Sequence, residues 1–328
     1  MRIAFIGGVP ASIGGGGLET QIGATADALR RRGHEVFRVE QEPEARPFDL
    51  LHAFGSDPDV GHMISHWRRN AAPLVVSPVI VVKPGIEERR QQIGVHLPIP
   101  VFGPRTRRHL LTRADLVVAQ TQHEAKLVSA WTRPAKPRVV VVPNAVDPLP
   151  AAEPPGGVPA EYVLLLGTVS TRKNQVGTVG MLSRTGTRAV IAGGFDGTPE
   201  ERERLVAEIA RTEACWLGDL EDRRAVAGLL RGARALIHMS SAEGQSLAVI
   251  EALSVGTPAI LSPLPAHREL RDAFPDHVRL AAGPKELSAA LRSLPRDLQP
   301  APIPTWDDVA AALEAQYERL VPVSHVAR

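Results

Sequence analysis

The chain has 328 residues, 44% of them hydrophobic and 23% charged, which excludes a disordered protein and provides enough length for two domains. Its one cysteine, Cys215, excludes an intramolecular disulfide framework and agrees with a reducing, cytoplasmic location. The net charge of +2 is unevenly distributed, because residues 1–150 carry 19 Lys and Arg against 14 Asp and Glu.

The basic excess of the first half is concentrated in four short clusters. They are residues 30–32, 68–69, 89–90 and 105–108. Each cluster alone is typical of a solvated helix face, but together they favour an anionic acceptor or peripheral contact with the inner face of a membrane. Aromatic residues do not alternate with the clusters in the pattern that binds single strands, so no nucleic-acid partner is expected.

The chain opens with a strand over residues 2–7, a glycine-rich loop over 14–17, a helix that Gly33 ends, and a strand over 35–39. This order is that of a dinucleotide-binding unit, and Glu40 lies near the place of its ribose-binding acid. The fingerprint G-x-G-x-x-G is not met, because Glu19 stands where the third glycine belongs. Four glycines still allow close approach of the backbone to a ligand, with a flexible surface loop as the alternative.

Further apolar runs predict strands that alternate with helices through both halves of the chain. They are residues 49–54, 73–82, 114–119, 138–142, 162–167, 189–194, 214–218, 235–239 and 258–261. Such alternation predicts two α/β domains, each with a parallel sheet covered on both faces. Residues 149–160, rich in Pro, Gly and Ala, are the expected linker between them, and residues 306–320 form a terminal amphipathic helix.

The segment after the strand 235–239 carries the strongest chemical signal. Glu243 lies on a polar turn, Ser246 is expected to cap a helix, and Glu251 lies in the second turn of that helix. The first N–H groups of the helix would suit a phosphate. Two glutamates placed in this way can face one ligand. The alternative is that Glu243 is an ordinary loop carboxylate and Glu251 a solvated helix residue.

Glu243 and Glu251, within Ser-x-x-Glu-Gly-x-Ser and before Glu-Ala-Leu-x-x-Gly-x-Pro, resemble the E-x7-E motif of retaining glycosyltransferase family 4. The segment Pro-Asn-Ala-Val-Asp at 143–147 is similar to another motif of that family. The resemblance implies a GT-B fold, in which two Rossmann-like parallel-sheet domains face an interdomain cleft. It implies an acceptor-side domain over 1–149, a nucleotide-sugar-binding domain over 150–304, and a helix over 305–328 that returns to the first domain.

The resemblance also implies roles for individual residues. Lys173 and Glu243 would be catalytic. The residues expected to bind the donor are Thr168, Arg172, Lys173, Leu220, Glu243, Gly244, Gln245, Ser246, Leu247 and Glu251, and those of the cleft loop beside the acceptor are Gly16, Gly17 and Glu19. Thr168 stands where relatives have an arginine that contacts the diphosphate, and Arg172 is its expected substitute.

A second departure concerns the acceptor chemistry. Many relatives place a histidine just after the fourth strand, whereas this chain has Ser77, Pro78 and Val79 there. His52, on the preceding strand, is the nearest candidate, but a lone strand histidine is more often structural. The usual retaining route of the family tolerates the loss, because the departing diphosphate itself takes the acceptor proton.

The predicted function is metal-independent transfer of a sugar, with retention, from a nucleotide-diphosphate sugar to a hydroxyl acceptor. No cofactor, no metal and no Asp-x-Asp triplet of the kind that holds a metal against a diphosphate are expected in the chain. Two alternatives stay open. One is a nucleotide-sugar 2-epimerase of GT-B fold, and the other is a catalytically impaired subunit that binds nucleotide sugars.

Overall fold

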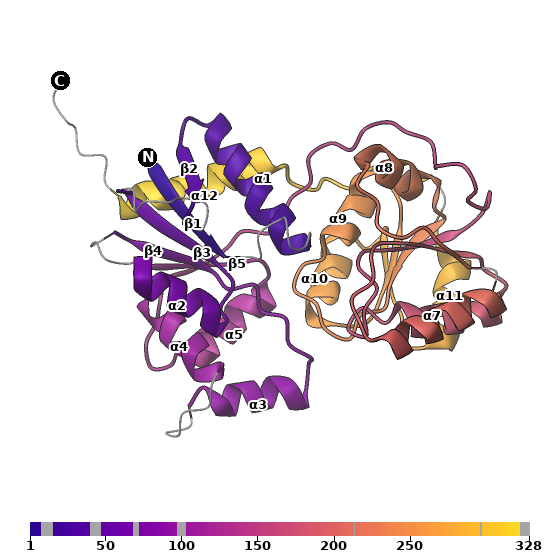
Figure 1. The fold of residues 1–328 in the computed structure, drawn as a ribbon, viewed down its shortest axis with the longest axis horizontal. Coiled ribbons are helices and arrows are strands. Elements are labelled where there is room, and N and C mark those ends of the chain that lie inside the picture. The colour runs from indigo at the N-terminus through magenta and orange to yellow at the C-terminus, as the bar shows by residue number, and fades with distance from the viewer. Residues whose placement is uncertain are drawn as a thin grey trace. The chain divides into compact units, whose positions relative to one another are not determined.

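The computed structural model describes residues 1–7, 16–39, 47–67, 72–96, 103–212, 214–295 and 297–321. The chain divides into two compact units, Met1–Ala145 with Pro304–Arg328, and Val146–Ile303 (Figure 1). Each unit contains a six-stranded sheet, and every strand pairing in both sheets is parallel. None of the helices in the described ranges is both long and apolar enough to cross a membrane.

The first unit has the strand order β2-β1-β3-β4-β5-β6. The strands are β1 (Arg2–Gly7), β2 (Glu35–Arg38), β3 (Leu50–Phe54), β4 (Leu74–Ser77), β5 (Leu116–Ala119) and β6 (Val139–Val141). The helices are α1 (Gly17–Arg31), α2 (Pro58–Trp67), α3 (Ile86–Gly94), α4 (Pro104–Arg113), α5 (Gln122–Thr132) and α12 (Trp306–Leu320). The chain adds β2 on one side of β1 and the later strands on the other, so the order reverses between β1 and β3.

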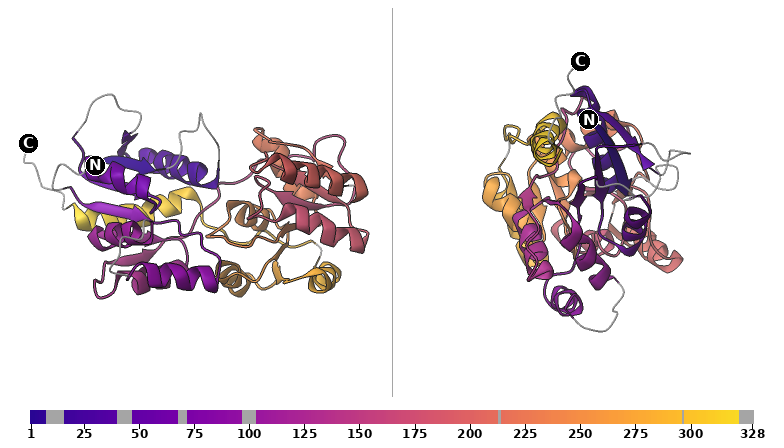
Figure 2. Two further views of the ribbon diagram at one scale, coloured as in Figure 1. Left: turned by 60° about the horizontal axis from the view of Figure 1, so that its bottom comes forward. Right: turned by 90° about the vertical axis from the view of Figure 1, so that its left-hand side faces the viewer.

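The terminal helix α12 belongs to this first unit and lies beside α1 (Figures 1 and 2). Thr305 and Asp308 form a capping box at its start. Near its end the Tyr317 hydroxyl lies 2.6 Å from Nδ1 of His52, whose Nε2 lies 2.9 Å from the Ser77 hydroxyl. His52 is fully buried, and burial lowers its pKa to about 3. The histidine therefore ties β3, β4 and α12 together as a neutral structural group.

The second unit has the order β12-β11-β10-β7-β8-β9. Its strands are β7 (Val163–Leu166), β8 (Ala189–Ala192), β9 (Cys215–Trp216), β10 (Ala235–His238), β11 (Ala259–Leu261) and β12 (Val278–Leu280). Its helices are α6 (Gln175–Leu182), α7 (Pro199–Thr212), α8 (Arg223–Gly232), α9 (Leu247–Ser254), α10 (Pro265–Ala273) and α11 (Pro284–Ser293), with a short 3-10 helix, Ser183–Thr185, after α6. Alternate strand residues supply two cores, one under α8, α9 and α10 and the other under α6, α7 and α11.

The predicted α/β class with two parallel sheets is confirmed, and each predicted strand overlaps a strand of the structure. The strand predicted over 73–82 is too long, because β4 ends at Ser77. Pro78 follows at once, and Val79 has a positive φ of 48°, which no strand accommodates. β12 was not predicted, since its three residues with Arg279 at the centre give no periodic signal.

The expected linker, residues 149–160, packs along α8 within the second unit. A Cβ on Gly228 would collide with the Glu153 carbonyl, so the absence of a side chain allows the two backbones to meet. The Arg231 guanidinium also donates a hydrogen bond to the Leu149 carbonyl at 3.1 Å. The units divide after Ala145 and after Ile303, compared with expected boundaries at 149 and 304.

Candidate functional site

The candidate site lies where the strand order of the second sheet reverses. β7 is the first strand of this unit, the chain then adds β8 and β9 on one side, and β10 pairs with β7 on the other. Because the two strands are parallel, the loops that follow them leave the same edge of the sheet. Ligands of open α/β sheets bind at such reversal points, outside the carboxyl ends of the strands.

The loops after β7 and β10 are joined by hydrogen bonds. The N–H and the hydroxyl of Ser241 donate to the Arg172 carbonyl, at 2.8 and 3.2 Å. In return Nη1 of Arg172 donates to the Ala242 carbonyl at 3.1 Å. These bonds hold Arg172 and Glu243, one from each loop and both predicted to bind the sugar donor, next to each other.

Glu243 is the centre of a buried polar cluster. Its Oε1 lies 3.0 Å from Nε2 of His238, 3.2 Å from the Ser240 hydroxyl and 2.9 Å from Nη1 of Arg172. Burial alone would raise the pKa of the Glu243 carboxyl, but the hydrogen bond from His238 and the neighbouring positive charges lower it to about 2. The carboxylate is therefore ionised although its side chain is only 9% exposed.

Lys173 lies beside the same carboxylate. Burial lowers the pKa of the lysine, and the charge of Glu243 opposes that shift. A Cβ placed on Gly167 would come within 2.6 Å of Nζ of Lys173, and Gly167 has a φ of 114°, which side chains other than glycine rarely adopt. The glycine at the end of β7 therefore leaves the space that the ammonium group fills.

Helix α9 begins next to this cluster. Ser246 is the N-cap residue, as predicted, but its hydroxyl makes no capping hydrogen bond. Gly244 and Gln245 precede it, and Leu247 is the first helical residue. The helix start therefore has no side-chain cap, the state in which backbone N–H groups can bind an anion.

Glu251 lies inside α9 and is 7% exposed. Its Oε1 forms an ion pair of 2.8 Å with Nη2 of Arg223, the first residue of α8. Leu220, in the loop before α8, packs against the same hydrophobic core as Leu247. Thr168 follows Gly167, and its carbonyl accepts a hydrogen bond of 2.9 Å from the Gln175 side chain.

A second buried histidine lies behind the cluster. His267 is fully buried near the start of α10, and its ring lies edge-on to His238 with centroids 5.7 Å apart. Its Nδ1 donates to the Ser262 carbonyl at 2.8 Å, while the Ser262 hydroxyl donates to the Ser240 carbonyl at 2.6 Å. The loop that carries Glu243 is thus tied to the end of β11.

The predicted cleft-loop residues belong to the first unit. Gly16 is the N-cap residue of α1 and Gly17 its first residue, while Gly14, Gly15 and Glu40 lie outside the described residues. Glu19, in the first turn, forms an ion pair of 2.6 Å with Arg38 at the end of β2. Arg38 also donates to the Gly7 carbonyl at 2.8 Å, so the ion pair is anchored at the end of β1.

The place where many family 4 relatives have a histidine holds a strained backbone and a buried carboxylate. Val79 has the left-handed φ of 48°, which is unfavourable for a β-branched residue. The Glu124 carboxylate accepts hydrogen bonds of 2.6 Å from the N–H groups of Ile80 and Gln120, and burial raises its pKa to about 7. Oε1 of Glu124 thus supports the loop after β4, and Oε2 supports the segment after β5.

One Asp-x-Asp triplet does occur in the sequence, at Asp57 and Asp59 in the first unit. It lies at the start of α2, where Oδ1 of Asp57 accepts a hydrogen bond of 3.0 Å from the Val60 N–H. Asp57 thus caps the start of this helix, and the expectation that the chain has no such triplet is wrong. In the ranges that the structure describes, no group of three or more His, Cys, Asp or Glu is arranged to hold a metal ion.

Residues 163–297 match the family model described as Glycosyl transferases group 1. This segment is a glycosyltransferase domain of that family. The whole chain also matches solved structures. One is a sucrose-phosphate synthase from Thermosynechococcus elongatus (TM-score 0.75, 16% identity, 98% of this chain and 100% of the other). AviGT4, a glycosyltransferase of avilamycin A biosynthesis, matches at TM-score 0.63 and 18% identity over 98% of each chain.

Alr3699/HepE from Anabaena, solved with UDP and glucose, matches at TM-score 0.60 and 18% identity, over 97% of this chain and 94% of the other. These likenesses show that the fold of the chain is GT-B, as predicted. No curated protein sequence matches the chain significantly.

Sequence reasoning did not identify His238, Ser240 and Arg223. His238 lies within the strand predicted over 235–239, where it interrupts an apolar run, and it is the last residue of β10. Its position five residues before Glu243 is the one signal that could have drawn attention to it. Arg223 precedes its partner by 28 residues on another helix, a relation that no sequence spacing reveals.

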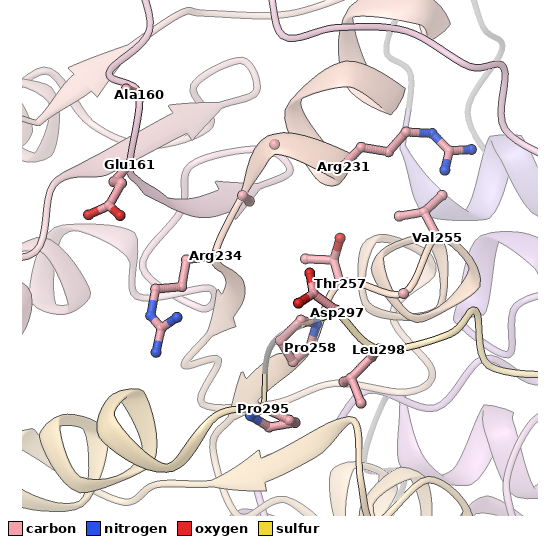
Figure 3. Close-up of a pocket in the computed structure, with 13 residues that line it drawn as sticks. Ala160, Glu161, Arg231, Arg234, Val255, Thr257, Pro258, Pro295, Asp297 and Leu298 are labelled. Carbon is pink, nitrogen blue, oxygen red and sulfur yellow. The ribbon is translucent and has the colours of Figure 1, made fainter.

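A hollow of about 360 Å³ opens at the other edge of the same sheet (Figure 3). Its lining includes Glu161 before β7, Arg234 before β10 and Pro258 before β11. These residues precede the strands, whereas the residues of the candidate site follow them. The hollow is therefore separate from the cluster around Glu243.

The buried histidines predict how stability depends on pH. Burial lowers the pKa of His267 to about 4, while the unfolded chain has the ordinary value of 6.5. Between these values the unfolded state binds a proton that the folded state does not, so the free energy of unfolding falls as the pH decreases. We expect His267→Asn, which keeps a donor for the Ser262 carbonyl, to reduce that slope by up to about 1.4 kcal/mol per pH unit.

Denaturant unfolding of both proteins at several values between pH 7 and pH 4.5 measures the slope. His52 lies in the first unit, away from the substitution, so its contribution is the same in both proteins and cancels from the comparison. Equal slopes for the wild type and His267→Asn would contradict the assignment of His267 as a neutral buried group.

Proposed function

We propose that the protein is a cytoplasmic, retaining and metal-independent glycosyltransferase that moves a sugar from a nucleotide-diphosphate sugar to a hydroxyl acceptor. One observation carries the proposal. An ionised, nearly buried carboxylate, Glu243, lies beside Lys173 and next to the uncapped start of α9, where the strand order of the second sheet reverses. The site offers one ligand a cation, a helix start without a side-chain cap, and a fixed carboxylate.

The donor diphosphate would lie at the start of α9, close to Lys173. Negative charge grows on the leaving diphosphate as the glycosidic bond breaks, so preorganised positive groups lower the barrier. Lys173 and the N–H groups from Gln245 to Leu247 supply such groups without a metal ion. The acceptor hydroxyl attacks from the face of the leaving group, and the departing diphosphate takes its proton.

The two glutamates would bind different parts of the donor. Glu243 would accept hydrogen bonds from sugar hydroxyls, and Glu251 would accept them from the ribose. Both carboxylates already have arginine partners, Arg172 at 2.9 Å and Arg223 at 2.8 Å, which keep them oriented before the donor arrives. Gly16, Gly17 and Glu19 would lie on the acceptor side.

The experiment that tests this function begins with a thermal-shift panel of nucleoside diphosphates and their sugars. At a fixed ligand concentration, a true donor raises the melting temperature by an amount that grows with the logarithm of its affinity. UDP and UDP-glucose come first, because a related structure was solved with UDP and glucose. Product analysis with and without acceptor alcohols, in EDTA, then distinguishes transfer from 2-epimerisation. Activity that EDTA abolishes and a divalent ion restores would contradict metal independence.

Binding without turnover against any acceptor would favour the alternative of an impaired binding subunit. Thr168 in place of the family arginine and Val79 in place of the histidine are the residues that motivate this alternative. Epimerised nucleotide sugar formed without an acceptor would favour the other alternative. Either result would replace the proposed reaction while leaving the donor site in place.

Substitution of the two glutamates should separate nucleotide binding from sugar binding. Glu251→Ala is expected to weaken UDP binding by about 1–3 kcal/mol, the value of a hydrogen bond to a charged group. Glu243→Ala should leave UDP affinity unchanged and weaken UDP-glucose alone. Calorimetric titration of both ligands measures this, with Glu203→Ala on the exposed surface of α7 as a control. Unchanged UDP affinity in folded Glu251→Ala would disprove the ribose assignment.

Lys173 is the side chain expected to act on the chemical step. Interactions that strengthen as the bond breaks raise kcat as well as affinity. Lys173→Ala should therefore lower kcat by on the order of 10²-fold or more, whereas Lys285→Ala, on exposed α11, should not. Steady-state kinetics decides the matter. A kcat near that of the wild type with only the donor KM raised would mean that the lysine binds the ground state and the transition state equally.

Peripheral contact with an anionic membrane surface also belongs to the proposal. α3 exposes Ile86 and Ile93, at 73% and 60%, on the face that carries Arg89 and Arg90 between them. Apolar side chains flanked by cations suit the interface of an anionic bilayer. We expect the protein to sediment with phosphatidylglycerol-containing vesicles and Ile86→Ser/Ile93→Ser to stay in solution. Val206→Ser, which removes an exposed apolar residue of the second unit, is the control, and equal sedimentation of all three would refute the contact.

A further inference from the structure

We infer that His238 is a positioning residue that fixes one oxygen of Glu243, so that the other oxygen is presented to the sugar of the donor. The inference rests on the proposed function, since it assigns the sugar contact to Glu243. The geometry that carries it lies entirely within the second unit. Three hydrogen-bonding side chains contact the same oxygen of the Glu243 carboxylate.

Three contacts of the Glu243 carboxylate fall on Oε1. His238, Ser240 and Arg172 approach this atom at 3.0, 3.2 and 2.9 Å. A carboxylate has two oxygens and about four acceptor positions. Among the contacts of the described residues, Oε2 receives none, so it is the oxygen left for a ligand hydroxyl.

The side chains that contact Oε1 differ in how exposed they are, and therefore in how easily they can move away from it. The Arg172 side chain is 41% exposed, whereas that of His238 is 4% exposed. An exposed guanidinium can turn toward a diphosphate when the donor binds, but the imidazole has no room to leave. His238 is therefore the contact that persists in both states.

The imidazole is itself locked in place. The Ser240 hydroxyl lies 3.0 Å from Nε2, and the ring of His267 packs edge-on at 5.7 Å. Burial lowers the pKa of His238, and its bond to Glu243 opposes that shift. A neutral ring with its proton on Nε2 donates a hydrogen bond to Oε1 without adding a charge. Arg172 and Lys173 supply the positive charge beside Glu243, whereas His238 fixes the orientation of its carboxylate.

If the Glu243 carboxylate loses this fixed orientation, transfer of the sugar should be impaired more than binding of the nucleotide. A catalytic group misplaced by about 1 Å can cost on the order of 10²-fold in rate. Glutamine can place its side-chain N–H₂ where Nε2 of histidine lies, whereas leucine has similar bulk and no donor. The pair His238→Gln and His238→Leu therefore separates hydrogen bonding from packing.

The test measures the UDP Kd by calorimetry and the donor kcat and KM by steady-state kinetics for the wild type and both variants. For His238→Leu we expect kcat/KM of the sugar donor to fall about 10- to 100-fold with an unchanged UDP Kd. For His238→Gln we expect values within a few-fold of the wild type. The acid limb of the pH profile of kcat/KM should move to higher pH in His238→Leu alone, because the hydrogen bond that lowers the pKa of Glu243 is lost.

His52→Leu provides a matched control for the loss of a buried, hydrogen-bonded histidine. It lies in the first unit and should lower the melting temperature without changing the ratio of UDP-glucose to UDP affinity. Two results would overturn the inference while the function stands: kcat/KM of His238→Leu equal to the wild type, or His238→Gln as impaired as His238→Leu. A wild-type protein that neither binds nor turns over any nucleotide sugar would instead refute the proposed function.

Discussion

The second unit depends on the way in which the negative charge of Glu243 is kept in a nearly buried position. Removing an ionised carboxylate from water costs several kcal/mol unless hydrogen bonds and opposite charges replace the lost hydration. Here His238, Ser240 and Arg172 provide that replacement at a single oxygen, and the pKa of the carboxyl falls to about 2. These contacts require β10, the loop after it and the loop after β7 to keep fixed relative positions.

The sheet topology supplies these positions. β7 and β10 pair in parallel at the point of reversal, so residues distant in sequence, such as Arg172 and Glu243, leave the sheet side by side. Gly167 then leaves room for the Lys173 ammonium group, and a Cβ on Gly193 would strike the Gly167 carbonyl. In the first unit, the ion pair of Glu19 with Arg38 lies at the carboxyl ends of the neighbouring strands β1 and β2. The close packing at Gly167 and Gly193 therefore both holds the second unit together and shapes the candidate site.

Much of this arrangement could be predicted from local sequence. The apolar runs give the strands, and Ser246 gives the start of α9, because period and capping are local properties. The partners of the glutamates could not be predicted. The Arg172–Glu243 pair joins residues 71 positions apart, and the Arg223–Glu251 pair joins two helices. Such contacts are set by strand order and helix packing, which no single segment encodes. His238 was missed for a related reason, since a histidine within an apolar run is usually a satisfied core residue.

The central claim is that a nucleotide-sugar donor binds at the carboxyl edge of the second sheet, with its diphosphate between Lys173 and the start of α9. The most direct measurement is a crystal structure of the protein soaked with UDP. The account predicts density for the diphosphate within hydrogen-bond distance of the first N–H groups of α9 and of Nζ of Lys173, with the ribose against Glu251. Density for UDP in the hollow at the other edge, beside Arg234 and Pro258, with an empty site at α9, would contradict it.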